Sequence, residues 1–237
     1  MARGLEIATE ADLRDTGFID SVGDLTMLLA NKQGQTSTRK VRVKTLEVTG
    51  DGDKGLSIFD SPADIKGTAV LTYSHALDPD EQWIYLPALK RVKRISSKNK
   101  SGPFMGSEFA YEDISSQEID KYTYKYIRDE VYNDIDCFVI ERYPTYKHSG
   151  YTRQVVWINK QEYRLEKTVF YDRKNTLLKT LEYSSYKQHL DKFWRSAVMK
   201  MVNHQTGKTT TLNWEHYQFK TGLTKKDFSR NSLKRAK

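Results

Sequence analysis

The stretch that decides the fold is DIDCFVIERYPTYKHSGYTRQVVWINK, residues 134–160, in which two runs of β-branched and aromatic residues flank a polar connection. Such runs are typical of β-strands. Similar runs precede and follow it, and most are separated by turns short enough for hairpins. This pattern predicts an up-and-down antiparallel meander and not a parallel sheet with crossover helices. The further runs cover residues 117–132, 163–175, 177–189, 193–207 and 208–219.

The first half of the chain predicts more strands and two short helical segments. A weak amphipathic pattern with a stop at Gly17 predicts a helix over residues 8–17, and roughly helical spacing predicts a helical turn over residues 63–71. Residues 81–96 read as two short strands broken by Pro87, because proline cannot donate to a strand ladder. Other strands are expected over residues 24–35, 38–48 and 56–59.

A long antiparallel sheet this rich in aromatic residues cannot leave both faces in water. A second sheet would make a sandwich, whereas the helical segments and the loop Phe104–Ile114 could instead fill the concave side of one bent sheet. These segments are too few to form a separate domain. We therefore expect a mainly β (α+β) fold over residues 1–237: a single strongly curved antiparallel sheet forming an unclosed half-barrel, with short helices and a loop plugging its concave face.

The composition limits the classes of partner and site. The chain has 39 Lys and Arg against 31 Asp and Glu, a net charge of +8, which admits an anionic partner such as phospholipid headgroups or nucleic acid. The lone cysteine, Cys137, excludes an internal disulfide and a multi-cysteine zinc site, and its apolar neighbours favour a buried, inert thiol. The last residues, about 222–237, form a basic tail that only Leu223, Phe228 and Leu233 could anchor.

The chain shows no targeting or spanning segment in its sequence. No run approaches the roughly 18 apolar residues of a membrane span. The opening MARGLEIATEAD lacks the apolar core of a signal peptide. Two alternatives follow: the protein is cytosolic, or an export signal has been removed.

Three stretches, followed by the long meander, carry a resemblance to a known family. They are DKGLSIFDSPADIKGTAVLTY (Asp53–Tyr73), DEQWIYLPALKRVKRI (Asp80–Ile95) and GPFMGSEFAYEDI (Gly102–Ile114). Together they are similar to the outer membrane lipoprotein-sorting proteins, the LolA-like family. The resemblance covers nearly the whole chain, and residues 83–114 are its most specific part.

The resemblance implies an unclosed β-barrel lined with apolar residues and covered by short helices. It also implies a soluble periplasmic carrier that holds the acyl chains of a lipoprotein or another lipid between the two membranes, without a cofactor. An inner-membrane exporter and an outer-membrane acceptor are the implied partners. Family members begin with a cleaved signal peptide, so Arg3–Asp12 resembles a mature N-terminus to which Met1 has been added.

A lipid carrier needs apolar area and not a catalytic constellation. Burial contributes roughly 0.8 kcal/mol per methylene, so ten methylenes contribute on the order of 8 kcal/mol, several times what one or two hydrogen bonds supply. The choice of side chains that point inward depends on the register, since a slip of one residue would turn each strand's inward residues outward. For every candidate residue, packing in an ordinary closed core is the alternative explanation. With alternation along the strands, the candidate wall residues are Trp83, Tyr85, Val155, Trp157, Val169, Leu212 and Trp214.

The loop Gly102–Ile114 supplies further candidate lipid contacts in Phe104, Met105, Phe109 and Tyr111. Glycines flanking Phe104 and Met105 would allow backbone movement, and methionine adapts to varied chain shapes, so the loop could be a movable apolar lid. A static plug is the equal alternative.

The basic run after Pro87 is a candidate surface for membrane headgroups. Lys90, Arg91, Lys93 and Arg94 could guide a carrier to anionic lipid, each charge contributing about 1 kcal/mol at low salt. A solvated strand face is the alternative explanation of the same run.

Two rival functions remain. The five histidines show no metal-ligand spacing, no nucleophile elbow or phosphate loop occurs, and Glu108, Glu112 and Asp113 read as solvated loop acids, so an enzyme has little support. The segment KYTYKYIR, residues 121–128, could stack nucleic-acid bases on its tyrosines, although an exposed strand face with alternating Tyr and Lys explains it more simply. We therefore expect a lipid carrier that has no nucleic-acid partner. The alternative is a basic β module that binds nucleic acid or another anion.

Overall fold

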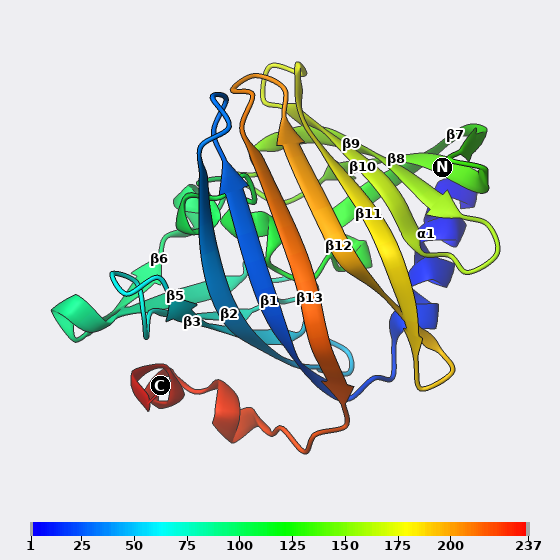
Figure 1. Ribbon diagram of the computed structural model, residues 1–237. Coiled ribbons are helices and arrows are strands. Elements are labelled where there is room, and N and C mark those ends of the chain that lie inside the picture. The colour runs from blue at the N-terminus through cyan, green and yellow to red at the C-terminus, as the bar shows by residue number, and fades with distance from the viewer. Residues whose placement is uncertain (1, 236–237) are drawn as a thin grey trace.

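A single antiparallel sheet holds the 13 strands found in residues 2–235, the part of the chain that the computed structural model describes (Figure 1). The strand order is β6-β5-β4-β3-β2-β1-β13-β12-β11-β10-β9-β8-β7, and the edge strands β6 and β7 do not pair, so the sheet is the predicted unclosed half-barrel. Met1 and the last two residues of the predicted basic tail lie outside the described residues. The strands are β1 (Asp20–Ala30), β2 (Thr36–Leu46), β3 (Lys54–Ser61), β4 (Ala69–Tyr73), β5 (Glu81–Leu86), β6 (Arg91–Ile95), β7 (Tyr122–Tyr132), β8 (Ile135–Pro144), β9 (Tyr151–Asn159), β10 (Leu165–Asp172), β11 (Leu177–His189), β12 (Phe193–Asn203) and β13 (Thr209–Phe219).

Two meanders, β1–β6 and β7–β13, meet in the middle of the sheet where β1 pairs with β13. Short turns join the consecutive strands of the second meander, as the short polar connections predict. Between β7 and β8, for example, Asn133 and Asp134 both have positive φ, the conformation of a two-residue hairpin turn.

The connection from β6 to β7 joins the two opposite edges of the sheet, so it has to cross a face of it. It crosses the concave face, where it packs against strands of both meanders. We call this connection, residues 96–121, the plug. Its backbone is irregular apart from short 3₁₀ turns, as its glycines and proline predict. These turns are η2 (Ser97–Asn99), η3 (Phe104–Gly106), η4 (Tyr111–Asp113) and η5 (Ile119–Lys121).

Helices cover the two faces at opposite ends of the sheet. Helix α1 (Ala2–Asp15) lies on the concave face of β7–β9, and the terminal segment with η6 (Lys225–Phe228) and α2 (Arg230–Arg235) packs on the other face of β3–β6 (Figure 1). Phe228 and Leu233 are fully buried there and Leu223 packs beside them, which confirms the three predicted anchors of the tail.

Helix α1 begins earlier than the predicted residue 8. Its first turn lies so close to β7 that a Cβ on Gly4 would come within 2.7 Å of the Tyr126 backbone nitrogen. The early glycine, which argues against a helix by propensity, is therefore what lets the helix lie on the sheet.

The predicted helical turn over residues 63–71 is wrong in its second half, because β4 starts at Ala69. Val70 belongs to the cluster on the concave face, and Ala69 and Leu71 belong to the cluster on the other face. A strand buried on both faces is apolar throughout and loses the alternation that identifies a strand.

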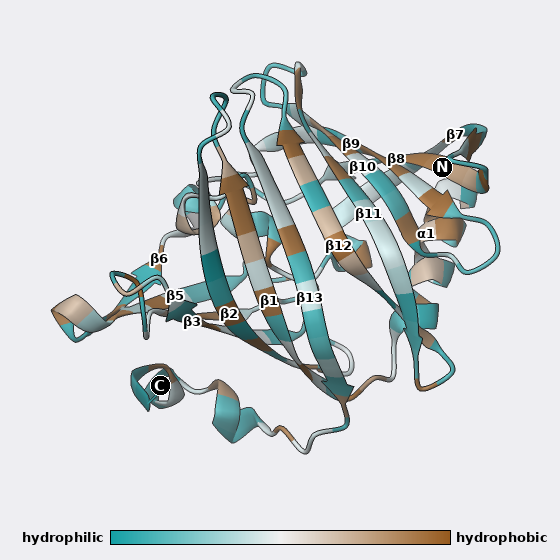
Figure 2. Ribbon diagram, in the orientation of Figure 1, coloured by the Kyte–Doolittle hydropathy of each residue, from teal (hydrophilic) through white to brown (hydrophobic). Residues whose placement is uncertain are grey.

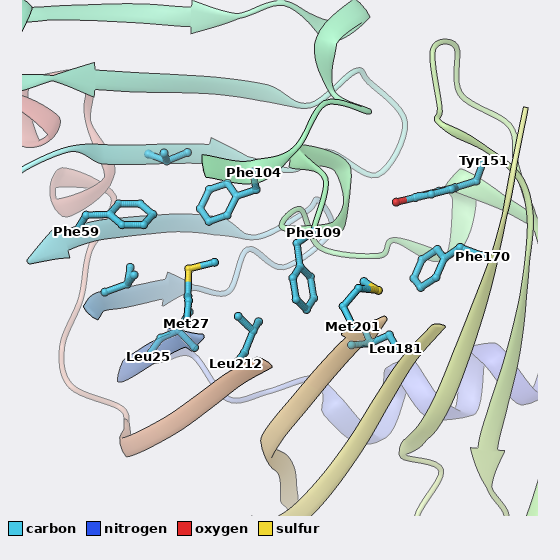
Figure 3. Close-up of a cluster of buried hydrophobic side chains, with 12 residues drawn as sticks. Leu25, Met27, Phe59, Phe104, Phe109, Tyr151, Phe170, Leu181, Met201 and Leu212 are labelled. Atoms are coloured by element: carbon cyan, nitrogen blue, oxygen red, sulfur yellow. The ribbon is translucent and has the colours of Figure 1, made fainter. Parts of the chain in front are cut away.

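Hydrophobic and hydrophilic bands alternate along the central strands in Figure 2, as expected where the two faces of a sheet have different surroundings. The largest cluster lies between the plug and the concave face (Figure 3). Phe104 of the plug points toward Phe59, with ring centroids 5.9 Å apart, and Phe109 points toward the strands that carry Met201 and Leu212.

Cys137 is fully buried on the other face of β8, as predicted. Burial, with the nearby Glu166 carboxylate, raises the pKa of its thiol to about 11. A thiol with such a pKa is almost entirely protonated at neutral pH, which is the inert form.

Candidate functional site

The plug covers only part of the concave face, and a cavity of about 1270 Å³ occupies the rest. It lies between α1, the end of the plug (residues 114–120) and the concave face of both meanders. Small-ligand pockets usually measure roughly 300–1,000 Å³, so this cavity has room for a larger molecule.

Small side chains form the floor of the cavity in the first meander. Gly23 of β1 and Ser57 of β3 flank Val43 of β2 in direct cross-strand register, and all three line the cavity. Gly55 and Ser21 continue the same floor. The cavity exists because these positions carry too few atoms to fill the space under the curved sheet.

Aliphatic side chains form the wall in the second meander. Ile140 of β8 and Val156 and Ile158 of β9 line the cavity, and Ile7 and Ala8 of α1 pack against the same cluster. Because α1 covers one side of this cluster, it both buries the wall and bounds the cavity.

Aromatic residues form the remaining wall on β11–β13. Trp214 stacks on Tyr217 with ring centroids 5.3 Å apart, and its indole Nε1–H is buried without a partner among the described residues. Burial raises the pKa of both Tyr183 and Tyr217, so both hydroxyls are neutral over the physiological range. Tyr186 donates to the carbonyl oxygen of Leu165.

A group of acids lines the cavity where α1 ends. Burial, followed by the nearby Glu118, Glu47 and Asp15 carboxylates, raises the pKa of Asp53 to about 7, although the Val48 N–H donates to it. Burial likewise raises the pKa of Glu118 and of Asp15. These carboxyls are harder to ionise than ordinary surface acids. No group of three or more His, Cys, Asp or Glu suited to a metal occurs in the described residues.

The plug is held in place by polar contacts as well as by its two phenylalanines. The Lys179 Nζ donates to the Asp113 carboxylate at 2.7 Å and to the Glu108 carbonyl oxygen at 2.9 Å. The Asn203 side chain donates to the Glu108 carboxylate at 2.6 Å. Phe104 and Phe109 are each 2% exposed, and Met105 and Tyr111 pack against the same cluster. These contacts favour the static plug over the movable lid.

The prediction that the plug acids are solvated is wrong for Glu112 and Asp113, whereas Glu108 is half-buried. Glu112 is 4% exposed, and its carboxylate accepts hydrogen bonds from Ser149, Tyr146 and the Gly150 N–H. The Asp113 side chain is 8% exposed and pairs with Lys179. Both acids tie the plug to the second meander, which sequence reasoning could not detect because their partners lie far away along the chain.

Among the seven predicted wall residues, Trp214 alone lines the cavity. Leu212 lies in the closed cluster under the plug, and Trp83 and Tyr85 pack with the C-terminal segment on the opposite face of the sheet. The other three predicted wall residues pack on the opposite face of β8–β10: Val155, Trp157 and Val169.

On β9 the cavity-facing residues are therefore one position away from the predicted ones. Every residue from Val155 to Ile158 is buried, since both faces of this strand are covered, so alternation carries no information about direction. On β11 Ser185 has a positive φ, although the register with β12 is the same on both sides of it, and Tyr183 and Tyr186, three residues apart, both reach the cavity. A period of two cannot predict this pair.

The predicted headgroup residues Lys90, Arg91, Lys93 and Arg94 are all exposed and lie away from the cavity. Lys90 directly follows η1 (Pro87–Leu89), and the other three lie on the edge strand β6. The Arg94 guanidinium donates to Glu81 at 2.7 Å. A role for them at membranes stays a prediction.

The tyrosines of residues 121–128 are not the exposed strand face that their alternation predicts. Tyr122 and Tyr124 are buried against α1, and Lys121 donates to the Asp80 carboxylate at 2.5 Å. The rings of Tyr122 and Tyr124 are therefore not free to stack on bases, and of the two observations that favoured a nucleic-acid partner only the net charge of +8 remains.

Neither α-helix in residues 2–235 has the length and apolar character needed to cross a bilayer.

Comparisons with known proteins identify similar chains over almost the full length. A family model described as uncharacterized protein matches residues 51–235. A protein domain from Vibrio parahaemolyticus whose name assigns it to outer membrane lipoprotein sorting is 59% identical, with a TM-score of 0.97 over 98% of this chain and 99% of that one. A DUF1329 family protein from Desulfovibrio piger is 30% identical, with a TM-score of 0.92 over 98% of each chain.

A LolA superfamily protein from Nitrosomonas europaea has the same fold at 20% identity, with a TM-score of 0.78 over 97% of this chain and 98% of that one. No curated protein matches the chain in sequence.

Proposed function

The chain belongs to a LolA-like family together with these lipoprotein-sorting and DUF1329 proteins, and from this membership we propose that it is a non-enzymatic carrier of acyl chains. The whole chain acts as one carrier domain. The cavity holds the hydrocarbon part of a lipoprotein or another lipid during transfer toward the outer membrane.

The observation that carries the proposal is the hollow on the concave face. Its volume of about 1270 Å³ and its aliphatic and aromatic walls suit a flexible hydrocarbon. Each sequestered methylene contributes roughly 0.8 kcal/mol, so a long chain binds without directional contacts. The name of the 59% identical relative supports a lipid-modified cargo.

A carrier of this kind works in the periplasm between two membranes. We assign it an inner-membrane exporter as donor and an outer-membrane acceptor as recipient. The exposed basic residues Lys90, Arg91, Lys93 and Arg94 draw it to anionic headgroups, a contribution that salt screens. Binding to anionic liposomes that does not change with salt would count against this part of the proposal.

Native mass spectrometry of protein purified gently from its own periplasm tests the cargo directly. We expect a retained lipid, whose mass identifies the ligand class. The Val43→Trp variant tests the location, because the indole would project into the cavity between Gly23 and Ser57. We expect its affinity for a fluorescent fatty acid to fall about tenfold or more, since occupied volume excludes chain methylenes.

The matched control is Lys44→Trp, one residue along β2 and facing the other side of the sheet. It should bind the fatty acid as the unmodified protein does. Equal loss in both variants, or no loss in a folded Val43→Trp variant, would place binding outside the cavity and contradict the proposal.

A further inference from the structure

Five basic side chains line the cavity, and four of them are already neutralised or hydrogen-bonded by the protein. The Arg14 Nε, for example, lies 2.7 Å from the Glu10 carboxylate. In the full set, Arg14 pairs with Glu10, Arg164 with Glu166 and Arg195 with Asp15, and Lys192 donates to the carbonyl oxygen of Thr16.

Arg142 of β8 is the exception. No carboxylate among residues 2–235 lies within 4.0 Å of its guanidinium. Its Nε donates to the Gln154 side-chain oxygen at 2.6 Å, and its Cζ lies 4.8 Å from the centroid of the Tyr122 ring. Both partners are neutral and buried, so they hold the guanidinium in position without compensating its charge.

The two terminal amino groups of Arg142 are free to bind. Nη1 and Nη2 donate to no described residue, and neither is among the described atoms that are buried without a partner. They therefore face open space, and Arg142 lines the cavity. The two free amino groups of a planar guanidinium match a carboxylate or phosphate, and such charge-assisted hydrogen bonds are about twice as strong as neutral ones.

The position of Arg142 joins this charge to the aliphatic wall. Arg142 is paired with Gln154, and the next residues on the same faces, Ile140 and Val156, are paired in the same register. Two residues along a strand span about 7 Å, so an anionic group at Arg142 places the first methylenes of its chain on this aliphatic wall.

We propose that Arg142 binds the anionic group of an amphiphile whose alkyl chain lies along Ile140, Val156 and Ile158. The inference rests on the carrier function proposed above and narrows the cargo to molecules that carry a carboxylate or phosphate next to a hydrocarbon chain. The head of the ligand then lies inside the cavity, against the wall beside α1, and not in the solvent.

Binding of palmitate and of hexadecanol tests the inference, since the two share a chain length and differ in charge. Delipidated protein is loaded with N-phenyl-1-naphthylamine, a neutral fluorescent probe, which each ligand then displaces. We expect Arg142→Gln to weaken palmitate about tenfold or more and to leave hexadecanol unchanged. Arg142→Lys should recover part of the loss, because it keeps the charge but not the fork.

Arg14→Gln is the matched control, since it removes a cavity-lining cation that the protein already pairs. It should leave both affinities unchanged. Equal weakening of palmitate and hexadecanol by Arg142→Gln, or no weakening of either, would overturn the inference while the carrier function stands. An unmodified protein that binds neither ligand would overturn both. Inorganic phosphate or acetate that competes with palmitate at low concentration would show a free-anion site instead and overturn the amphiphile assignment.

Discussion

The same strands form both halves of the concave face, yet one half is filled and the other is hollow. Along β3 the inward side chains change from Gly55 and Ser57 in the cavity to Phe59 under the plug. Along β1 they change from Ser21 and Gly23 to Leu25 and Met27. The curvature of the backbone is shared, so the size of the side chains decides which half can take a guest.

The two halves also differ in how their charges are satisfied. In the filled half Asp113 is paired with Lys179, and Glu112 accepts three hydrogen bonds. In the hollow half Arg142 has no carboxylate partner among the described residues, and the pKa of Asp53 is raised to about 7. The filled half is therefore a stability element, and the hollow half keeps groups that a ligand or a proton can satisfy.

Truncation of Phe59 should produce the largest effect on stability. Its side chain is fully buried against Phe104, so Phe59→Ala leaves a cavity that the surrounding residues fill only partly. We expect a loss of about 3–5 kcal/mol in the free energy of unfolding, measured by urea denaturation.

Ser57→Ala is the control on the same strand, two residues away. It removes a single oxygen from the hollow half, and we expect a change within about 0.5 kcal/mol. If the two variants lost the same free energy, the contrast between a filled and a hollow half would be wrong.

Removal of one buried charge should produce the next largest effect. Lys179→Met leaves Asp113 without its cation in a site where the lysine is 4% and the acid 8% exposed. We expect a loss of about 3 kcal/mol in the free energy of unfolding. The double variant Lys179→Met and Asp113→Asn should be less destabilised than the single one, because it leaves no unpaired charge.

The Lys179→Met variant also distinguishes between the two hypotheses for residues 96–121, a static plug and a movable lid. A segment that opens readily in the native state would lose little when its fastening is removed, so a loss below about 0.5 kcal/mol would favour the lid. The lid hypothesis further predicts weaker fatty-acid binding when Phe104, Met105 and Phe109 are truncated. Unchanged affinity in a folded variant would leave the plug as the explanation.

The strands and the plug could be predicted from the sequence, because their signals are local. The hairpin turn at Asn133 and Asp134 is encoded by two residues that tolerate positive φ, and the irregular plug by its glycines and proline. The mainly β half-barrel follows from these signals together with the need to cover a curved sheet.

The face of each strand could not be predicted in the same way. Val155 and Val156 are both buried on β9, one on each face, so neither hydropathy nor alternation distinguishes the wall of the cavity from the opposite cluster. The floor of the cavity cannot be predicted for a different reason. Gly23 and Ser57 give no hydrophobic signal, and only the pairing of the strands places small residues side by side across the sheet.

The titration of Asp53 should produce the smallest effect. Burial raises the pKa of this carboxyl from its ordinary value of 3.8 to about 7. Between these two values the unfolded chain has lost the proton and the folded chain keeps it, so this group stabilises the folded state fully below about pH 4 and loses that contribution as the pH rises through about 7. Asp53→Asn removes the titration. At pH 8 we expect the variant to be more stable than the unmodified protein by about 1 kcal/mol, less than the full shift implies because water reaches part of the side chain.

Asp51→Asn, two residues away, is the control with the opposite sign. Burial alone would raise the pKa of Asp51, but hydrogen bonds from His75 and from the Ala76 N–H hold it at about 2. Its charged form is therefore the stable one, and the asparagine variant should be the less stable protein at pH 8. Urea denaturation of both variants from pH 4 to pH 8 separates the cases. The difference from the unmodified protein should grow between pH 4 and pH 7 for Asp53→Asn and stay nearly constant for Asp51→Asn, whose carboxyl titrates below this range. If the difference in stability between Asp53→Asn and the unmodified protein did not grow with pH, Asp53 would not keep its proton toward pH 7, and this contrast in charge between the two halves would rest on Arg142 alone.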